Sequence, residues 1–152
     1  MSGHGANAPD EFNLERFVRA QQGIFESACA EMQRGLKRGH WMWFIFPQIA
    51  GLGQQSSTST RFAIASIQEA RAYLAHPILG PRLKEISSIV SSLKGTPIGQ
   101  VLGPIDSMKL KSSMTLFAHA TADNQPFLNI LQVHFGGQFD PLTLKLLERE
   151  KT

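Results

Sequence analysis

Two short stretches of the sequence hold most of the side chains that could bind a ligand or transfer a proton. Residues 40–61 combine aromatic, glycine, hydroxyl and basic residues, whereas residues 106–113 combine an acid with lysines and serines. The candidates in the first stretch are His40, Trp41, Trp43, Gln48, Gly51, Gly53, Ser56 and Arg61. The candidates in the second stretch are Asp106, Lys109, Ser112 and Ser113.

These residue types fit a pocket for a small anionic or nucleotide-like ligand. Because Gly51 and Gly53 have no Cβ atom, the backbone amides around them can approach a ligand closely. The charged groups of Arg61 and Lys109 can donate to phosphate or carboxylate oxygens, and a tryptophan offers a flat face to a base or a sugar. A histidine ordinarily titrates near neutral pH, which makes His40 the candidate acid or base.

The sequence leaves open whether the chain is an enzyme. It contains no His-Glu-x-x-His zinc motif, no Gly-x-Ser-x-Gly nucleophile motif and no Gly-Lys-Ser/Thr phosphate loop. The single cysteine, Cys29, excludes a metal cluster built from the cysteines of this chain. We therefore predict neither a metal site nor a cofactor.

The first stretch has a second interpretation, in which its aromatic residues only pack. Trp41, Phe44 and Ile45 fall on one face of a helix, as expected of a short buried helix. The alternative to a ligand-binding protein is then a protein-interaction module without a small-molecule site, which an exposed patch of methionine and aromatic side chains would mark. Whether Trp41 and Trp43 are buried, line a cleft or face solvent distinguishes these hypotheses.

Charge and hydropathy narrow the class of partner. The net charge is +3 and no Lys/Arg run is longer than Lys37–Arg38, which argues against a nucleic-acid partner. No apolar run approaches about 18 residues, so we expect no membrane helix. The first ten residues lack the basic and apolar segments of a signal peptide. The sequence therefore predicts a cytoplasmic protein.

Helix patterns recur along the chain, and strand patterns are scarce. Apolar residues follow a period close to 3.6 in most segments, and Ser66 with Glu69 matches a capping box at one helix start. A chain of 152 residues fits one domain. We predict an all-α protein with a disordered start at residues 1–10 and a single compact domain at 11–152. The expected main helices are 14–38, 66–76, 77–95, 106–122, 127–135 and one that begins at 141, six in all, with short turns at 41–46, 61–65 and 96–103.

Four segments resemble a bacterial family known as domain of unknown function 1810, which includes mycobacterial hypothetical proteins. They are GHWMWFIFPQIAGLG from Gly39, EARAYLAHPILGPRL from Glu69, DSMKLKSSMTLFA from Asp106 and FGGQFDPLTLKLL from Phe135. The resemblance covers nearly the whole chain after about Asp10. It implies a mainly helical fold and no particular catalytic residue, because the family has no assigned role. Members are sometimes labelled calpastatin, a disordered inhibitor, whereas this chain has the composition of a packed globule, with 42% hydrophobic and 18% charged residues.

Overall fold

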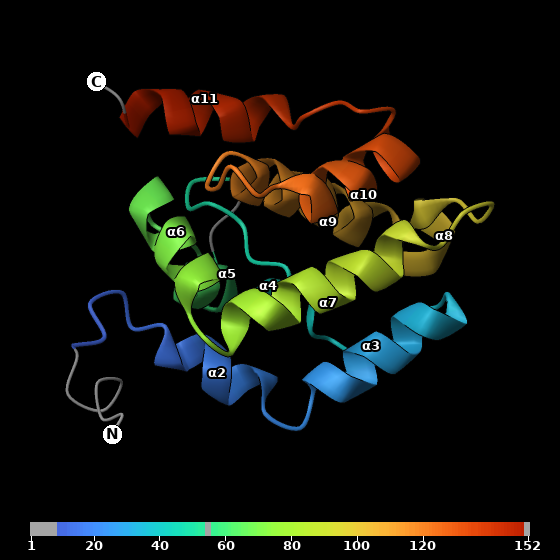
Figure 1. The fold of residues 1–152 in the computed structure, drawn as a ribbon, viewed down its shortest axis with the longest axis horizontal. Helices are drawn as coiled ribbons and strands as arrows, with labels where there is room; N and C mark the ends of the chain where they lie inside the picture. The colour runs from blue at the N-terminus through green and yellow to red at the C-terminus, as the bar shows by residue number, and fades with distance from the viewer. Residues whose placement is uncertain (1–8, 54–55, 151–152) are drawn as a thin grey trace.

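The structure, a computed structural model, describes residues 9–53 and 56–150, and this part of the chain is all-α (Figure 1). It contains ten helices, and the one extended pairing among these residues is a parallel bridge between Ile49 and Ile64. The predicted fold class is confirmed. None of the described helices is long and apolar enough to cross a membrane.

Six helices have nine residues or more, in agreement with the expected number of main helices. They are α3 (Phe25–Arg34), α6 (Ile67–Ala75), α7 (Leu79–Ser91), α9 (Pro104–Ala118), α10 (Gln125–Phe135) and α11 (Pro141–Glu150). Four are shorter: α2 (Glu15–Gln21), α4 (Met42–Ile45), α5 (Ser57–Phe62) and α8 (Ile98–Leu102).

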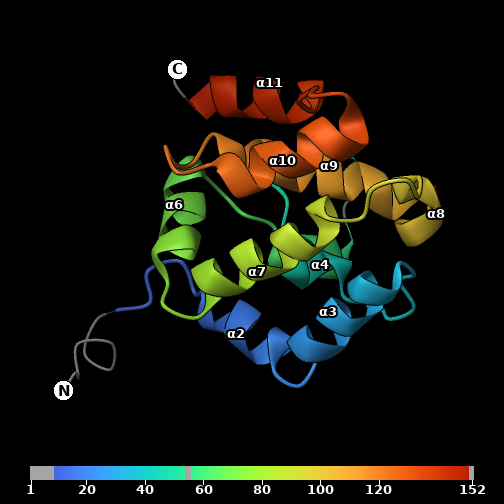
Figure 2. The same ribbon diagram turned by 45° about the vertical axis from the view of Figure 1, so that its right-hand side comes forward.

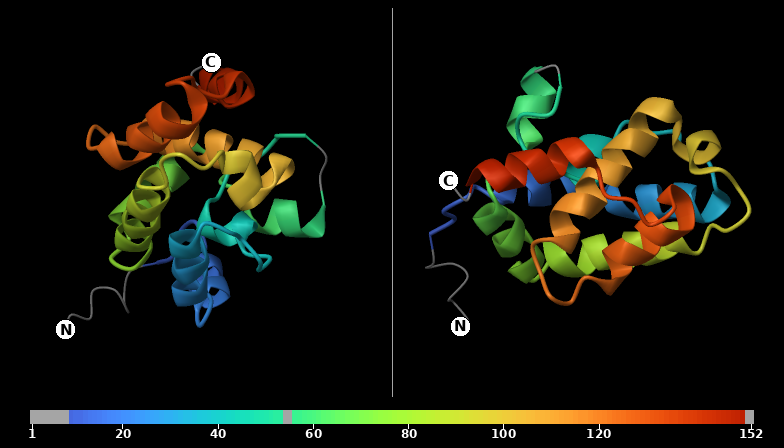
Figure 3. Two further views of the ribbon diagram at one scale, coloured as in Figure 1. Left: turned by 90° about the vertical axis from the view of Figure 1, so that its right-hand side faces the viewer. Right: turned by 90° about the horizontal axis from the view of Figure 1, so that it is seen from above.

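Helices α7 and α9 organise the interior. Helix α7 packs against α3, α6 and α10, and α9 packs against α6, α8, α10 and α11 (Figures 1 and 2). Helix α5, by contrast, projects at the edge of the molecule (Figure 3). The candidate stretch 40–61, which ends in α5, therefore reaches from the core to the periphery.

A run of aromatic contacts crosses the core and joins four helices. The ring centroids of Phe17 in α2 and Tyr73 in α6 lie 5.1 Å apart, and the next contact, from Tyr73 to Phe117 in α9, measures 5.3 Å. Phe117 then meets Phe127 in α10 at 5.9 Å. All four side chains are at most 1% exposed. Such rings bury large apolar areas and prefer these tilted or edge-on arrangements, so they fix how the helices pack.

The single helix expected at residues 14–38 is divided into α2 and α3, so this prediction is wrong in detail. Gly23 has a φ of 76°, in the left-handed region that glycine adopts without strain, and it turns the chain between the two helices. Helix α3 also ends before the expected residue 38, because Gly35 caps its C-terminus with a φ of 77°.

Asp10 fixes the backbone at the beginning of α2. Both carboxylate oxygens of Asp10 accept backbone N–H groups, from Leu14 at 2.7 Å and from Glu15 at 2.9 Å. Residues 1–8 of the predicted disordered start lie outside the described part of the chain.

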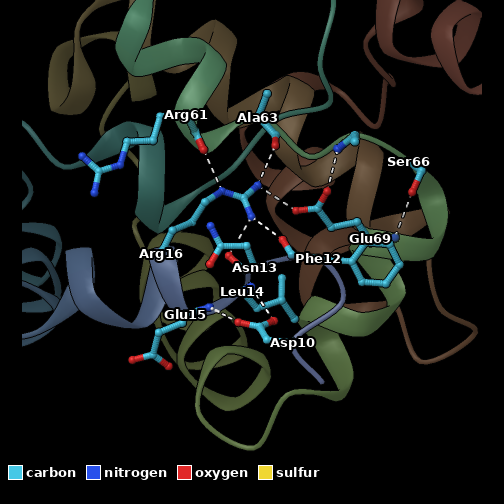
Figure 4. A network of polar contacts seen from close by, with 11 residues as sticks. Asp10, Phe12, Asn13, Leu14, Glu15, Arg16, Arg61, Ala63, Ser66 and Glu69 are labelled. Atoms are coloured by element: carbon cyan, nitrogen blue, oxygen red, sulfur yellow. Dashed lines mark hydrogen bonds and ion pairs between the residues drawn. The ribbon is translucent and has the colours of Figure 1, made fainter. Parts of the chain in front are cut away.

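A buried ion pair joins α2 to α6 and to the segment that follows α5 (Figure 4). The guanidinium of Arg16 lies 2.7 Å from the Glu69 carboxylate, and these side chains are 13% and 3% exposed. Glu69 also accepts the N–H of Ala65 at 2.9 Å. The Arg16 guanidinium donates to four carbonyl oxygens, those of Phe12 at 2.6 Å, Asn13 at 2.9 Å, Arg61 at 2.6 Å and Ala63 at 2.8 Å. This network holds the end of α5 and the residues that follow it, up to Ala65, against α2 and α6.

Candidate functional site

The apolar segment at residues 41–46 is part of the core. Trp41, Met42, Ile45 and Phe46 are at most 3% exposed. The ring of Trp41 lies 6.4 Å from that of Phe46, centroid to centroid. The interpretation of this segment as a short buried helix is confirmed, and Trp41 offers no open face to a ligand. Trp43, on α4, is half-buried.

Glu31 in α3 fixes the backbone just before α4. Its Oε1 accepts the N–H groups of Arg38 at 2.8 Å and Gly39 at 2.9 Å, and the indole N–H of Trp41 at 2.9 Å. Partial burial by itself would raise the pKa of Glu31. The three hydrogen bonds and the nearby charge of Lys37 outweigh burial, so the pKa lies below its ordinary value and the carboxylate stays charged.

The two candidate stretches meet where Lys109 covers Trp43. The Nζ atom of Lys109 lies 3.7 Å from the centroid of the Trp43 ring, within the range of a cation–π contact. Asp106, one turn earlier in α9, contacts Lys109 at 3.4 Å and Lys37 at 2.9 Å. All three charged side chains are at most 19% exposed. The structure thus brings Trp43, Asp106 and Lys109 together, as the pocket hypothesis requires.

Asp106 owes its position to the start of α9. The helix begins at Pro104, two residues before the expected start, so Asp106 lies in the first turn and points to the lysines. Lys37 has left α3 beyond Gly35, and its Nζ donates to the Gly39 carbonyl at 2.6 Å. The sequence alone did not identify Lys37 and Glu31 as site residues, because their contacts depend on how the chain turns after Gly35. Their nearness to Trp41 in the sequence is the one feature that could have indicated them.

A small cavity adjoins the same tryptophan. Trp43, Gln48 and Gly51 line it together with the other residues of the 48–52 loop, Ser59, Phe62 and Ala63. Its volume is about 20 Å³, close to the minimum that holds one water molecule. The loop is fixed by two backbone bonds of 2.8 Å, from Ala50 N–H to Ile64 O and from Ile64 N–H to Gln48 O. Three predicted residues therefore share one hollow, and it has room for about one oxygen atom.

The other candidates of the first stretch lie elsewhere. Ser56 caps α5, where its Oγ accepts the N–H of Ser59 at 3.0 Å. Arg61 is exposed at a groove that it shares with Arg16 and Arg19. His40 is exposed, and no hydrogen bond or ion pair joins it to another residue in the described ranges, so nothing orients it as an acid or a base. Gly53 is exposed, with a φ of 64°.

Ser112 and Ser113 point into the protein and not toward Trp43. The Oγ of Ser112 donates to Asp140 Oδ2 at 3.1 Å, and Asp140 in turn accepts the N–H of Thr143 at 3.0 Å as the cap of α11. Ser113 is fully buried, and its hydroxyl has no hydrogen-bond partner among the described residues. The first serine has a structural partner, and the second is an isolated polar group in the core.

We expect Ser113→Ala to raise the free energy of unfolding by about 1 kcal/mol, because a buried unpaired hydroxyl costs about 1–3 kcal/mol and the substitution removes it at little loss of volume. Urea unfolding followed by circular dichroism measures this difference. A marked loss of stability would show that the hydroxyl has a stabilising partner in solution.

Comparison with known proteins places the chain in a family. The model of a family described as "Protein of unknown function (DUF1810)" matches residues 11–147. The chain belongs to the DUF1810 family. The match agrees with the resemblance carried by the four sequence segments, and its description does not mention calpastatin.

A solved structure shares the DUF1810 fold seen here. It is the crystal structure, at 1.38 Å, of the conserved hypothetical protein Rv1873 from Mycobacterium tuberculosis. The two proteins are 49% identical, the alignment covers 91% of this chain and 99% of that one, and the TM-score is 0.89. A search of curated proteins found no match. The function of this DUF1810 protein must therefore be inferred from its own residues.

Proposed function

We propose that this DUF1810 protein binds a small anionic or nucleotide-like ligand at the junction of α4 and α9, around Trp43 and Lys109. The observation that carries the proposal is the 3.7 Å contact between the Lys109 Nζ and the Trp43 ring, next to a hollow lined by Gln48 and Gly51. Trp43 thereby contacts a cation and also lines the hollow beside a loop with an exposed glycine.

The charges around Lys109 favour an anionic ligand. Asp106 is shared between Lys37 and Lys109, so these three side chains carry one net positive charge. An ammonium has three N–H donors; the ion pair with Asp106, at 3.4 Å, needs at most one of them, and the Trp43 face interacts with the cation as a whole. Lys109 therefore retains donor capacity for a phosphate or carboxylate oxygen, and the hollow that Trp43 lines has the volume of about one such atom.

The proposal concerns binding and includes no reaction. His40 was the expected acid or base, but it is exposed and the structure gives it no orienting partner within the described residues. General acid–base catalysis requires a group held within hydrogen-bonding reach of the reacting proton. We therefore assign His40 no part in the proposed function.

Removal of the Lys109 ammonium should abolish the thermal stabilisation by small anions. We expect adenosine monophosphate, inorganic phosphate or malate to raise the melting temperature of the wild-type protein, since a ligand at about ten times its Kd stabilises the folded state by about 1.4 kcal/mol. Lys109→Ala should abolish this shift. Lys84→Ala is the matched control, because Lys84 is a half-exposed lysine on α7 that pairs with Asp123 at 3.6 Å.

A second readout uses the tryptophan itself. Binding beside Trp43 should change the fluorescence of the wild-type protein and leave that of Trp43→Phe, which retains the buried Trp41, unchanged. The proposal is wrong if none of the three anions shifts the melting temperature, or if the Lys109 and Lys84 variants respond alike.

The alternative, a protein-interaction module, has one observation in its favour. Ile105 and Met108 lie one turn apart on α9 and are 72% and 54% exposed. Two side chains make a smaller patch than the several hundred Å² that mark a typical interface. This alternative predicts no thermal response to any small anion, so the same screen distinguishes the two functions.

A further inference from the structure

A larger cleft lies where the C-terminal end of α11 comes close to the beginning of α6 (Figures 1 and 2). It has a volume of about 510 Å³, within the range of small-molecule sites. Six residues line it, namely Ile67, Gln68, Arg71, His119, Leu147 and Glu150. None of them belongs to the site around Trp43.

The framework of the cleft is fixed from both sides. Glu150 Oε1 accepts the N–H of Ile67 at 2.9 Å, which joins the end of α11 to the first turn of α6. At the other end of α11, Asp140 is 7% exposed and caps the helix. The Glu150–Ile67 bond therefore fixes the end of α11 against the first turn of α6, and Asp140 fixes the start of α11.

The hydrogen bonding of His119 defines what its ring offers to the cleft. The ring Nδ1 lies 2.8 Å from the carbonyl oxygen of Thr115, and the ring packs edge-on against Phe139 with centroids 4.7 Å apart. A carbonyl oxygen only accepts, so Nδ1 carries the proton. In the neutral imidazole the Nε2 atom is then an acceptor, suited to an N–H or O–H group of a ligand.

The cleft also holds two opposite charges that are not paired with each other. Arg71 has no ion-pair or hydrogen-bond partner among the described residues. Glu150 uses one carboxylate oxygen for the Ile67 N–H, which leaves Oε2 as an acceptor. Between these polar groups, Ile67 and Leu147 provide apolar walls. A guanidinium is shaped to bind a carboxylate through two parallel hydrogen bonds.

We propose that this cleft binds a free α-amino acid with an apolar side chain. Its carboxylate pairs with Arg71, its ammonium donates to Glu150 Oε2 and His119 Nε2, and its side chain packs between Ile67 and Leu147. A zwitterion of this kind provides a carboxylate for Arg71 and a donor for Glu150 Oε2 at once, whereas a simple anion provides no donor for Oε2 and brings a second negative charge close to Glu150.

Isothermal titration with L-leucine tests the proposal on the full chain. We expect L-leucine to bind with a Kd no weaker than about 1 mM. Leucinamide, which lacks the carboxylate, and 4-methylpentanoate, which lacks the amine, should each bind at least about tenfold more weakly, because each loses the charge-assisted hydrogen bonds at one end of the ligand. L-Leucyl-glycine distinguishes a free amino acid from the N-terminus of a peptide.

Two variants and a control assign the binding to this cleft. Arg71→Ala should weaken L-leucine binding at least about tenfold, whereas Arg34→Ala, at an exposed position on α3, should leave it unchanged. His119→Asn retains an N–H near the Thr115 carbonyl but removes Nε2, so it should also weaken binding. Circular dichroism establishes that each variant is folded. If His119→Asn does not fold, the comparison of Arg71→Ala with Arg34→Ala tests the proposal.

Binding of L-leucine to this cleft is expected to be independent of anion binding around Trp43. Lys109→Ala should bind L-leucine as the wild type does, and Arg71→Ala should retain the thermal response to adenosine monophosphate. The proposal is overturned if L-leucine gives no heat of binding, if leucinamide and 4-methylpentanoate bind as well as leucine, or if the Arg71 variant binds like the Arg34 variant. Tighter binding of leucyl-glycine than of leucine would overturn the assignment to a free amino acid.

Discussion

Replacing Arg16 by alanine is expected to lower the free energy of unfolding by about 3–5 kcal/mol, since it leaves the partner charge of a buried pair uncompensated. The Glu69 carboxylate, 3% exposed, would lose the guanidinium 2.7 Å away. The four carbonyl oxygens that accept from Arg16, two near the start of α2 and two at the end of α5 and just after it, would lose a donor at the same time. Urea unfolding followed by circular dichroism measures the change.

The control for Arg16 is its neighbour in the same helix. The Arg19 side chain is 78% exposed and lies 3.5 Å from Glu15, so Arg19→Ala should change stability by no more than about 0.5 kcal/mol. A double variant, Arg16→Met with Glu69→Leu, removes both charges and should recover much of the stability lost in Arg16→Ala. Equal stability of the Arg16 and Arg19 variants would show that the network contributes nothing.

Replacing Trp41 by alanine is expected to lower the free energy of unfolding by about 3–5 kcal/mol. The ring is 2% exposed, and its removal leaves a cavity that the surrounding helices cannot fill. The variant also removes the indole donor that lies 2.9 Å from Glu31 Oε1. Circular dichroism is the suitable probe, because the substitution itself alters tryptophan fluorescence.

Two further variants separate packing from hydrogen bonding at this position. Trp41→Phe keeps most of the apolar ring and should fall between the wild type and the alanine variant. Trp43→Ala, two residues along, removes a half-buried ring and should lower stability less than Trp41→Ala does. If Trp41→Ala unfolds at the wild-type urea concentration, Trp41 does not belong to the core in solution.

Local patterns in the sequence predict most of the fold. Residues that belong to α7, α10 and α11 were expected to be helical from apolar periodicity and from proline, glycine and cap positions, which act within a turn or two of the chain. The break at Gly23 is harder to foresee, because a glycine inside a helical pattern is tolerated at about 1 kcal/mol. Here α2 packs on α4 while α3 packs on α7, and these different partners require the turn.

The capping box at Ser66 shows the limit of a local rule. The Ser66 Oγ accepts the Glu69 N–H at 3.1 Å, as predicted. The Glu69 carboxylate, however, binds the Ala65 N–H and the Arg16 guanidinium, 53 residues away in the sequence. The buried cation attracts the carboxylate more strongly than a single amide does, because a charge in the interior must be paired.

At the candidate site, too, the sequence indicates residue types and the structure determines their contacts. The pairing of Trp43 with Lys109 was anticipated only as a meeting of two stretches, and the structure supplies the contact and the bridging Asp106. Ser56, Ser112 and Ser113 resemble ligand-binding hydroxyls by type, yet they cap a helix or point into the interior. Residue type indicates what a side chain can do, but its partner depends on which helix face is turned toward the core.

The sequence by itself determined the fold class and the approximate positions of most helices, because these follow from periodicity and capping over a few residues. It left two interpretations of the Trp41 segment, and the structure decided for burial. The tertiary structure alone decided which charges are paired, that Lys109 covers Trp43, and that Arg71, His119 and Glu150 border one cleft. Those relations join residues far apart in the chain, and their distances are set by how whole helices pack.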